Sequence, residues 1–127
     1  MPLAVMVASC ASIKDLIDEP TALGEFEVSR NYEGVFRSLK SYALQCYQEK
    51  DYDHKTTVDA RISSEFKSAE ISVVTRWIDI SKHKMYIGLK AIGPSETVVT
   101  VRDLYIAGAG RRLENLKTTA KAGSASC

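Results

Sequence analysis

The chain has 127 residues, the size of one domain with a single hydrophobic core. Hydrophobic residues make up 45% of the sequence and charged residues 26%, as in an ordinary globular protein. Seventeen Lys and Arg balance sixteen Asp and Glu, which leaves a formal net charge of +1. Such a chain has no global field that would attract DNA, RNA or anionic lipid, so we expect no nucleic-acid partner.

Residues 1–10 form an apolar run that ends in two small residues and a cysteine. The run is too short to span a bilayer, which takes about 20 apolar residues. Its last four residues, Val7-Ala8-Ser9-Cys10, match every position of the lipobox, so the segment resembles the distal half of a bacterial lipoprotein signal peptide. The alternative interpretation is a buried first strand with an incidental cysteine.

The lipobox resemblance implies both a modification and a location. Residues 1–9 are then a partial signal peptide, and its removal leaves Cys10 as an amino-terminal residue that carries palmitate or similar acyl chains. Two or more such chains hold a protein on a membrane without a transmembrane helix. Ala11 stands where an Asp would favour the inner membrane, so the resemblance implies the periplasmic face of the outer membrane. Because no basic segment precedes the run, we expect the natural chain to start upstream of Met1.

The next segment separates the lipid attachment point from the folded domain. Residues 10–23 have no clear hydrophobic period and are interpreted as the lipidated cysteine and a tether. Residues 24–127 are then a single domain. Within it, Gly24–Arg30 alternates apolar and polar residues, which predicts a strand with one buried face and one solvated face.

A long amphipathic helix is the most clearly patterned element of the sequence. Asn31 is a favourable N-cap residue, and Glu33 places a negative charge in the first turn. Apolar residues then recur every three or four positions from Tyr32 to Cys46, which predicts an apolar stripe along one side. The polar segment Asp51–Asp53 is expected to end the helix.

Four further strands are predicted by the alternation of apolar and polar side chains. The connections between them are short and turn-like, which favours antiparallel hairpins and therefore a meander. Trp77 shares one side of its strand with Ile71 and Val73, so we expect it to pack in the core. The predicted strands are Thr56–Ile62, Ala69–Ile78, His83–Ile92 and Glu96–Tyr105.

The last predicted element is a second, shorter helix. Gly108 and Gly110 break the preceding strand, and Leu113 and Leu116 keep a helical spacing within Arg111–Ala122. The sequence therefore predicts a two-layer α+β fold of order β-α-β-β-β-β-α. Its antiparallel sheet would carry the long helix across its apolar face, with the short helix at the C-terminus.

The chain has three cysteines, Cys10, Cys46 and Cys127, which are too few for a four-thiolate zinc site and include no Cys-x-x-Cys pair. Cys46 lies on the apolar stripe of the long helix, where a buried free thiol would act as a small hydrophobe. In an oxidising periplasm with Cys10 acylated, however, Cys46 and Cys127 are the two remaining thiols. Under that condition we expect them to form a disulfide.

The helix and the C-terminus carry a second resemblance. The stretch Tyr42-Ala43-Leu44-Gln45-Cys46 and the ending Ala120–Cys127 are similar to small Gram-negative envelope lipoproteins that have a cysteine in a helix and another at the end of the chain. These families are largely uncharacterised. The resemblance therefore implies a location and a fold, but no activity.

No enzyme class is indicated by the motifs of the sequence. It contains no Gly-x-Ser-x-Gly elbow and no His-Glu-x-x-His, so we predict neither catalysis nor a cofactor or metal. The leading hypothesis is a non-enzymatic interaction or accessory protein that contacts another envelope component. An alternative is a periplasmic module that binds a hydrophobic ligand or peptide. A third is a hydrolase whose Asp, His or Ser residues are brought together by folding.

A few residues could carry chemistry but have simpler interpretations. His54 and His83 have no carboxylate or cysteine at metal-ligand spacing and are expected to be surface or turn histidines, not zinc ligands. Gly108–Arg112 could hold a phosphate at a helix N-terminus, but it lacks a full motif and is interpreted as a turn. Asp51 and Asp53 are interpreted as unpaired surface charges. Side chains of the kinds enriched in interface hot spots are Arg76, Trp77, Tyr86 and Tyr105.

Overall fold

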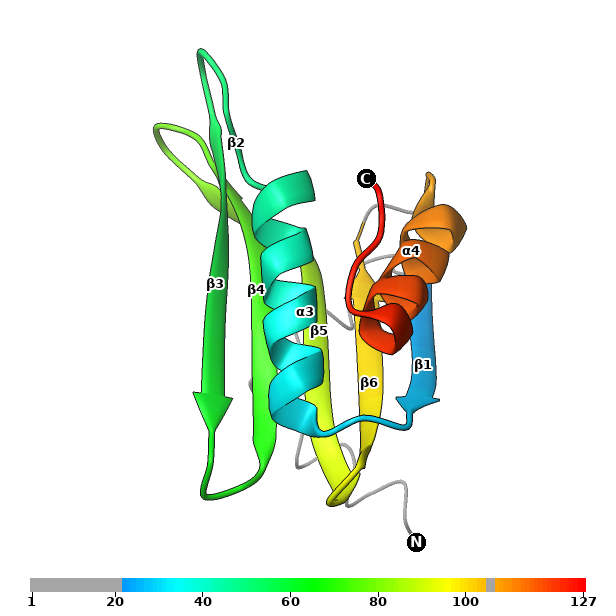
Figure 1. Cartoon of the computed structure of the whole chain (residues 1–127). Coiled ribbons are helices and arrows are strands. Elements are labelled where there is room, and N and C mark those ends of the chain that lie inside the picture. The colour runs from blue at the N-terminus through cyan, green and yellow to red at the C-terminus, as the bar shows by residue number, and fades with distance from the viewer. Residues whose placement is uncertain (1–21, 105–106) are drawn as a thin grey trace, which may run out of the picture.

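A computed structural model describes residues 22–104 and 107–127. Within these residues the chain forms a six-stranded antiparallel sheet with a longer and a shorter helix on one face, an α+β fold as predicted (Figure 1). The elements are β1 (Ala22–Val28), α3 (Tyr32–Cys46), β2 (Glu49–Lys50), β3 (Lys55–Ser63), β4 (Ser68–Arg76), β5 (Ser81–Gly93), β6 (Glu96–Asp103) and α4 (Ala109–Ala122).

The order of strands across the sheet is β1-β6-β5-β4-β3-β2. Strands β3 to β6 are connected by turns and paired with their neighbours, so the predicted meander is confirmed. β1 pairs with β6 at one edge, with Phe26 opposite Val99, and α3 then carries the chain across the sheet to β2 at the other edge. The two-residue strand β2 was not predicted, because two exposed residues show no alternation.

The long helix is held on the sheet by the predicted apolar stripe. Asn31 caps it, since its side chain accepts a hydrogen bond from the backbone N–H of Glu33 at 2.9 Å. The helix ends at Cys46, before the polar segment that was expected to stop it. Fully buried residues that meet under α3 and α4 include Leu39, Ile71, Ile87, Val99 and Leu116.

Trp77 is not a core residue, contrary to the prediction. Ile71, Val73 and Thr75 are buried on one face of β4, so the alternation expected from the sequence continues to the end of the strand. The register shift beside them places its extra residue, Lys84, in β5, because Val73 is opposite Met85 and Val74 is opposite His83. The strand then ends at Arg76, and Trp77 lies in the β4–β5 turn with 36% of its surface exposed.

Two close contacts fix the position of the C-terminal helix. Gly24 in β1 lies so close to α4 that an added Cβ would be 2.6 Å from a methyl carbon of Leu113. Arg30, which follows β1, donates a hydrogen bond of 2.7 Å to the carbonyl of Ala120. The helix begins at Ala109, two residues earlier than predicted, because Gly108 with a φ of +78° forms the N-cap and Gly110 is helical.

The end of the chain is joined covalently to the long helix. Gly123 ends α4 with a φ of +95°, and its N–H bonds to the carbonyl of Thr119 at 2.8 Å. The chain then turns back toward α3, where Cys127 forms a disulfide with Cys46 across a sequence separation of 81 residues. The predicted pair is therefore present. None of the helices in the described ranges is long and apolar enough to cross a membrane.

Candidate functional site

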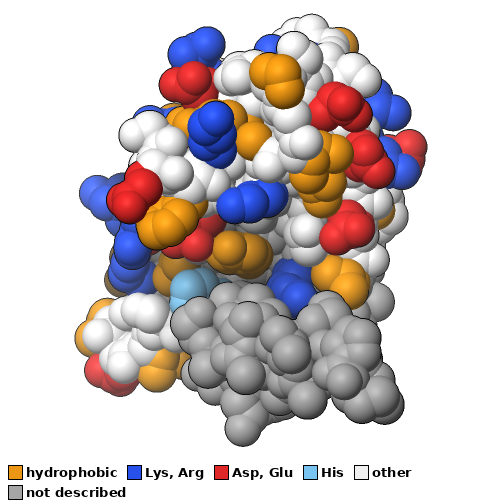
Figure 2. Space-filling view, turned by 90° about the horizontal axis from the view of Figure 1, so that it is seen from below, with side chains coloured by type: hydrophobic (Ala, Val, Ile, Leu, Met, Phe, Trp, Pro, Cys, Tyr) orange, Lys and Arg blue, Asp and Glu red, His pale blue; other side chains and the backbone are white. Residues whose placement is uncertain are grey.

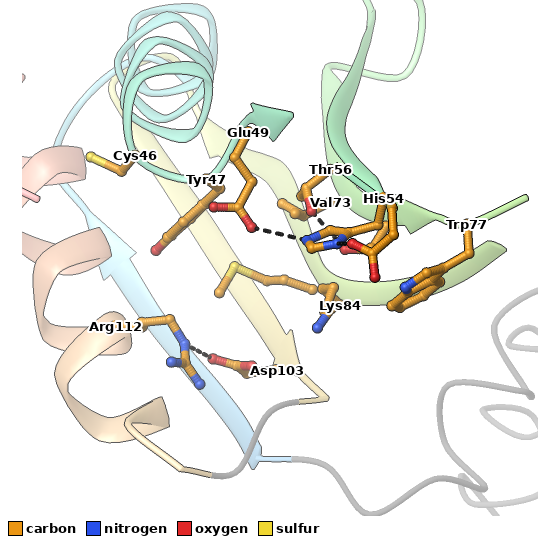
Figure 3. A pocket seen from close by; sticks show the side chains of 13 residues that line it. Cys46, Tyr47, Glu49, His54, Thr56, Val73, Trp77, Lys84, Asp103 and Arg112 are labelled. Carbon is orange, nitrogen blue, oxygen red and sulfur yellow. Dashed lines mark hydrogen bonds and ion pairs between the residues drawn. The ribbon is translucent and has the colours of Figure 1, made fainter. Parts of the chain in front are cut away.

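A pocket opens at the end of the sheet where α3 and β6 finish and α4 begins (Figure 3). Its volume of about 550 Å³ falls in the range of small-molecule sites. Side chains from most elements of the fold line it, although they are far apart in the sequence. These are Cys46, Tyr47, Glu49, Asp53, His54, Thr56, Val73, Thr75, Trp77, Lys84, Met85, Asp103 and Arg112.

The base of the pocket is apolar and tightly structured. Val73 and Met85 are buried, and Met85 is opposite Val73 on the neighbouring strand. Beside them Thr56 and Thr75 share a buried hydrogen bond of 2.8 Å between their hydroxyl oxygens. One of these hydroxyls donates to the other, so both take part in a hydrogen bond within this wall of the pocket. The Val73 and Met85 side chains beside them suit an apolar part of a ligand.

One side of the pocket is formed by a histidine surrounded by carboxylates. The Nδ1 of His54 donates a hydrogen bond to Asp53 at 2.8 Å, while its Nε2 lies 3.6 Å from Glu49 and 3.9 Å from Asp51. The imidazole also contacts the Trp77 indole, with ring centroids 5.8 Å apart. The hydrogen bond that Asp53 accepts, followed by the charge of that residue, raises the pKa of His54 above its usual value.

This cluster corrects one prediction from the sequence. Asp51 and Asp53 are not unpaired surface charges, because the β2–β3 turn brings both to His54. His54 itself is a turn histidine, as predicted, and is partly buried. Metal-ligand spacing rules missed the cluster because they describe side chains at regular intervals on helices and strands. A tight turn instead places neighbouring residues around the His54 imidazole.

Replacing Asp53 with Asn should lower the pKa of His54, because the amide removes the charge that favours the imidazolium. A raised pKa in the folded state stabilises the protein below the unfolded value of about 6.5, and this stabilisation is lost as the pH rises through the folded value. NMR titration of the His54 ring in the parent and in Asp53→Asn measures the shift. Identical titration curves would show that Asp53 has no influence on the histidine.

An ion pair forms the opposite side of the pocket. Arg112 in α4 donates through Nε to the carboxylate of Asp103, at the end of β6, over 2.6 Å. Asp103 is almost completely buried, whereas Arg112 is partly exposed. The same guanidinium donates to the carbonyl of Ala107 at 2.9 Å. Arg112 thus connects the start of α4 to the sheet. Of the two arginines in the predicted strand-to-helix turn, Arg112 is the one that makes this contact.

Tyr47, the first residue after α3, closes the pocket between these two sides (Figure 3). Burial raises the pKa of its phenol well above the ordinary value, and the neighbouring Tyr42 adds to this effect. The rings of Tyr42 and Tyr47 meet edge to face with centroids 5.7 Å apart. The Tyr47 hydroxyl is buried beside Tyr42, and its phenol is protonated at neutral pH.

The other predicted residues have varied outcomes. Cys46 lines the pocket through its place at the end of α3, while Cys10 and Tyr105 lie outside the described residues. Tyr86 is partly buried on the opposite face of β5 and donates to Glu70 at 3.1 Å. Burial, followed by the charge of Glu70, raises the pKa of Tyr86 to about 12. It is therefore held by its neighbour across the strand.

The sequence analysis missed Tyr47, Thr75 and Lys84 as pocket residues. Lys84 is the extra residue of the β5 irregularity, so alternation could not show which face it occupies. Tyr47 lies one residue beyond the helix, where the helical period no longer applies. The period-two spacing of Thr75 with Ile71 and Val73 is the signal that could have found Thr75.

Two Ser-x-x-Lys spacings occur in the chain, but neither has the geometry of a nucleophile and its base. Ser64 and Lys67 lie in the exposed β3–β4 turn, where Lys67 adopts a φ of +49°. Ser81 and Lys84 lie in β5, and residues three apart on a strand point to opposite faces. Serine-lysine chemistry needs both side chains on the same side.

No group of three or more His, Cys, Asp and Glu side chains in the part of the chain that the structure describes could hold a metal ion. The fold and the pocket define a disulfide-bonded α+β domain with a ligand-sized cavity. No protein-family model matches this sequence, and no curated protein is significantly similar to it.

Proposed function

We propose that the chain is a lipid-anchored bacterial envelope protein, held on the periplasmic face of the outer membrane through acylated Cys10. The observation that carries this proposal is the Cys46–Cys127 disulfide. Disulfides of this kind persist in oxidising compartments such as the periplasm. With these two residues paired, Cys10 is the remaining cysteine of three, and it is the one that ends the lipobox Val7-Ala8-Ser9-Cys10.

We further propose that the anchored domain acts by binding and not by catalysis. The charged groups around the pocket support this role, because they serve the fold itself. Asp103 and Arg112 neutralise each other at 2.6 Å, and His54 is held by Asp53 at 2.8 Å. An acid or base used in catalysis must instead be able to reach a substrate proton. The domain would therefore hold another envelope component without changing it.

Replacing Cys10 with Ala tests the anchor. In a Gram-negative host, the parent chain preceded by a complete signal peptide should incorporate labelled palmitate and fractionate with the outer membrane. Cys10→Ala should lose the label and appear in the soluble periplasmic fraction, because no acyl chain remains to hold it. Cys46→Ala/Cys127→Ala is the matched control, since it removes thiols and keeps the lipobox. Equal fractionation of Cys10→Ala and the parent would contradict the proposal.

The pocket favours a second candidate, a periplasmic module that binds a small hydrophobic ligand or peptide. Val73, Met85 and Trp77 supply apolar surface to the pocket. Apolar surface beside directed polar groups is typical of ligand sites, and ionisable side chains line the rest of this pocket: Glu49, Asp53, His54, Lys84, Asp103 and Arg112. Native mass spectrometry of protein purified from the periplasm distinguishes the candidates, because a module of this kind would carry a bound small molecule.

A further inference from the structure

The two hairpin turns beside the pocket project from the same end of the sheet (Figure 1). The β2–β3 turn is closed by a hydrogen bond of 2.8 Å from the N–H of Asp51 to the carbonyl of His54, which leaves Tyr52 and Asp53 at its tip. The β4–β5 turn is closed in the same way, at 2.8 Å, from Trp77 to Ile80. Both tips are thus short, fixed turns.

Large apolar side chains occupy these tips without any cover from the described chain. Ile78 is 96% exposed, Ile80 is 62% exposed, and Tyr52 is fully exposed. The ring contact between Trp77 and His54 connects the two turns, since each ring comes from one of them. Together Tyr52, Trp77, Ile78 and Ile80, hereafter the apolar tips, form one projecting group. Single exposed apolar residues are common, but a projecting cluster of this kind marks a contact surface.

The chain enters the domain at this same end. Ala22, the first residue of β1, is opposite Asp103 of β6, and Asp103 is opposite Met85 of β5, just after the β4–β5 turn. Only residues 11–21 separate Cys10 from this point. Twelve peptide steps of about 3.5 Å reach at most about 40 Å, so a lipid on Cys10 keeps this end of the domain near the membrane.

We propose that the apolar tips insert into the lipid bilayer interface as a second membrane contact of the domain. This inference rests on the proposed lipid anchor. Trp and Tyr are the side chains enriched at membrane interfaces, where an apolar ring and a polar atom are both accommodated, and the isoleucines beside them supply purely apolar surface. A tether to Cys10 would make insertion an intramolecular step, so that even a weak contact is populated.

Charge has little part in this contact. The two turns and their flanking residues carry four cations, Lys50, Lys55, Arg76 and Lys82, against four carboxylates, Glu49, Asp51, Asp53 and Asp79. The sum is zero, so anionic lipid has no net charge to attract. On the face seen from below the view of Figure 1, both charge signs are also interspersed with apolar side chains (Figure 2). We therefore expect insertion to depend weakly on the fraction of anionic lipid.

The opposite end of the sheet provides a matched control. Ile62, Phe66 and Ile92 are 45%, 64% and 52% exposed, and they flank the β3–β4 and β5–β6 turns. They lie far along the strands from the point where the chain enters β1. If exposure alone caused membrane contact, this opposite end of the sheet would also insert into the membrane. The proposal requires that only the apolar tips insert.

Trp77 is the single tryptophan of the sequence and reports directly on the apolar tips. The acylated full chain is reconstituted in vesicles of phosphatidylethanolamine and phosphatidylglycerol that contain brominated phosphatidylcholine. We expect Trp77 emission to shift to shorter wavelength and to be quenched by the bromine atoms. Ile78→Ser/Ile80→Ser should lower the ratio of inserted to free tips by about tenfold, because two apolar side chains no longer leave water. Phe66→Ser/Ile92→Ser should leave the quenching unchanged.

Other outcomes overturn the proposal. Unquenched Trp77 emission in acylated protein on vesicles would exclude insertion, as would equal quenching in the parent and Ile78→Ser/Ile80→Ser. A lipid-independent dimer that this variant dissociates would assign the tips to a second copy of the chain. Failure of the lipid anchor would be seen separately, as loss of palmitate labelling. The unacylated variant Cys10→Ser, added at high lipid concentration, tests the tips independently of that result.

Discussion

Replacing both Cys46 and Cys127 with Ser should lower the free energy of unfolding by about 4 kcal/mol. The disulfide closes a loop with a sequence separation of 81 residues, and a loop of this length greatly restricts the unfolded chain. The bond also joins the C-terminal tail to the end of α3, which lines the pocket. Urea unfolding of the parent and of Cys46→Ser/Cys127→Ser measures the difference.

Reduction supplies the control for this prediction. The parent protein treated with a reducing agent should unfold at nearly the same urea concentration as Cys46→Ser/Cys127→Ser, because both lack the crosslink. The reducing agent should have no effect on the variant. A midpoint that is equal in the oxidised parent and in the variant would show that the bond is absent in solution or contributes nothing to stability.

The second large effect is expected in the core under α3. Leu39→Ala should destabilise the fold by about 3 kcal/mol, because the change removes a completely buried side chain and leaves a cavity. Leu39 lies in the middle of the helix and belongs to the core that contains sheet residues such as Ile71 and Ile87. Thermal and urea unfolding, followed by circular dichroism, give the magnitude.

Leu44→Ala is the comparison within the same helix. Leu44 is 38% exposed, so its truncation removes less buried surface, and we expect a change of about 0.5 kcal/mol. Both variants place the same residue in the same helix, so their intrinsic helix propensities cancel. Similar losses in the two variants would contradict the assigned packing of α3 on the sheet.

The elements that could be predicted are those with a long, regular pattern. The stripe of α3 and the alternation of β3, β5 and β6 each extend over eight or more residues, and the structure places them as expected. Short or irregular elements were missed. β2 has two exposed residues, β5 carries an extra residue at Lys84, and β4 ends at Arg76, so Trp77 lies in the turn beyond the strand. Local alternation carries no information about a bulge.

The candidate pocket depended on contacts between distant segments. His54 meets Trp77 across the β2–β3 and β4–β5 turns, and Arg112 meets Asp103 only after α4 folds back onto the sheet. Hydrophobic periodicity describes each segment by itself, so it could not bring these side chains together. The same limit applies to the apolar tips, whose shared position follows from strand pairing.

The sequence by itself determined the α+β class, the apolar face of α3 and the candidate cysteine pair, because periodicity and residue type are local properties. Only the tertiary structure decided that β1 pairs with β6 and that Cys127 reaches Cys46. It also decided that the pocket and the apolar tips lie at the end of the sheet where the chain enters β1. The physical reason is that strand order and helix docking depend on the packing of residues far apart in the chain.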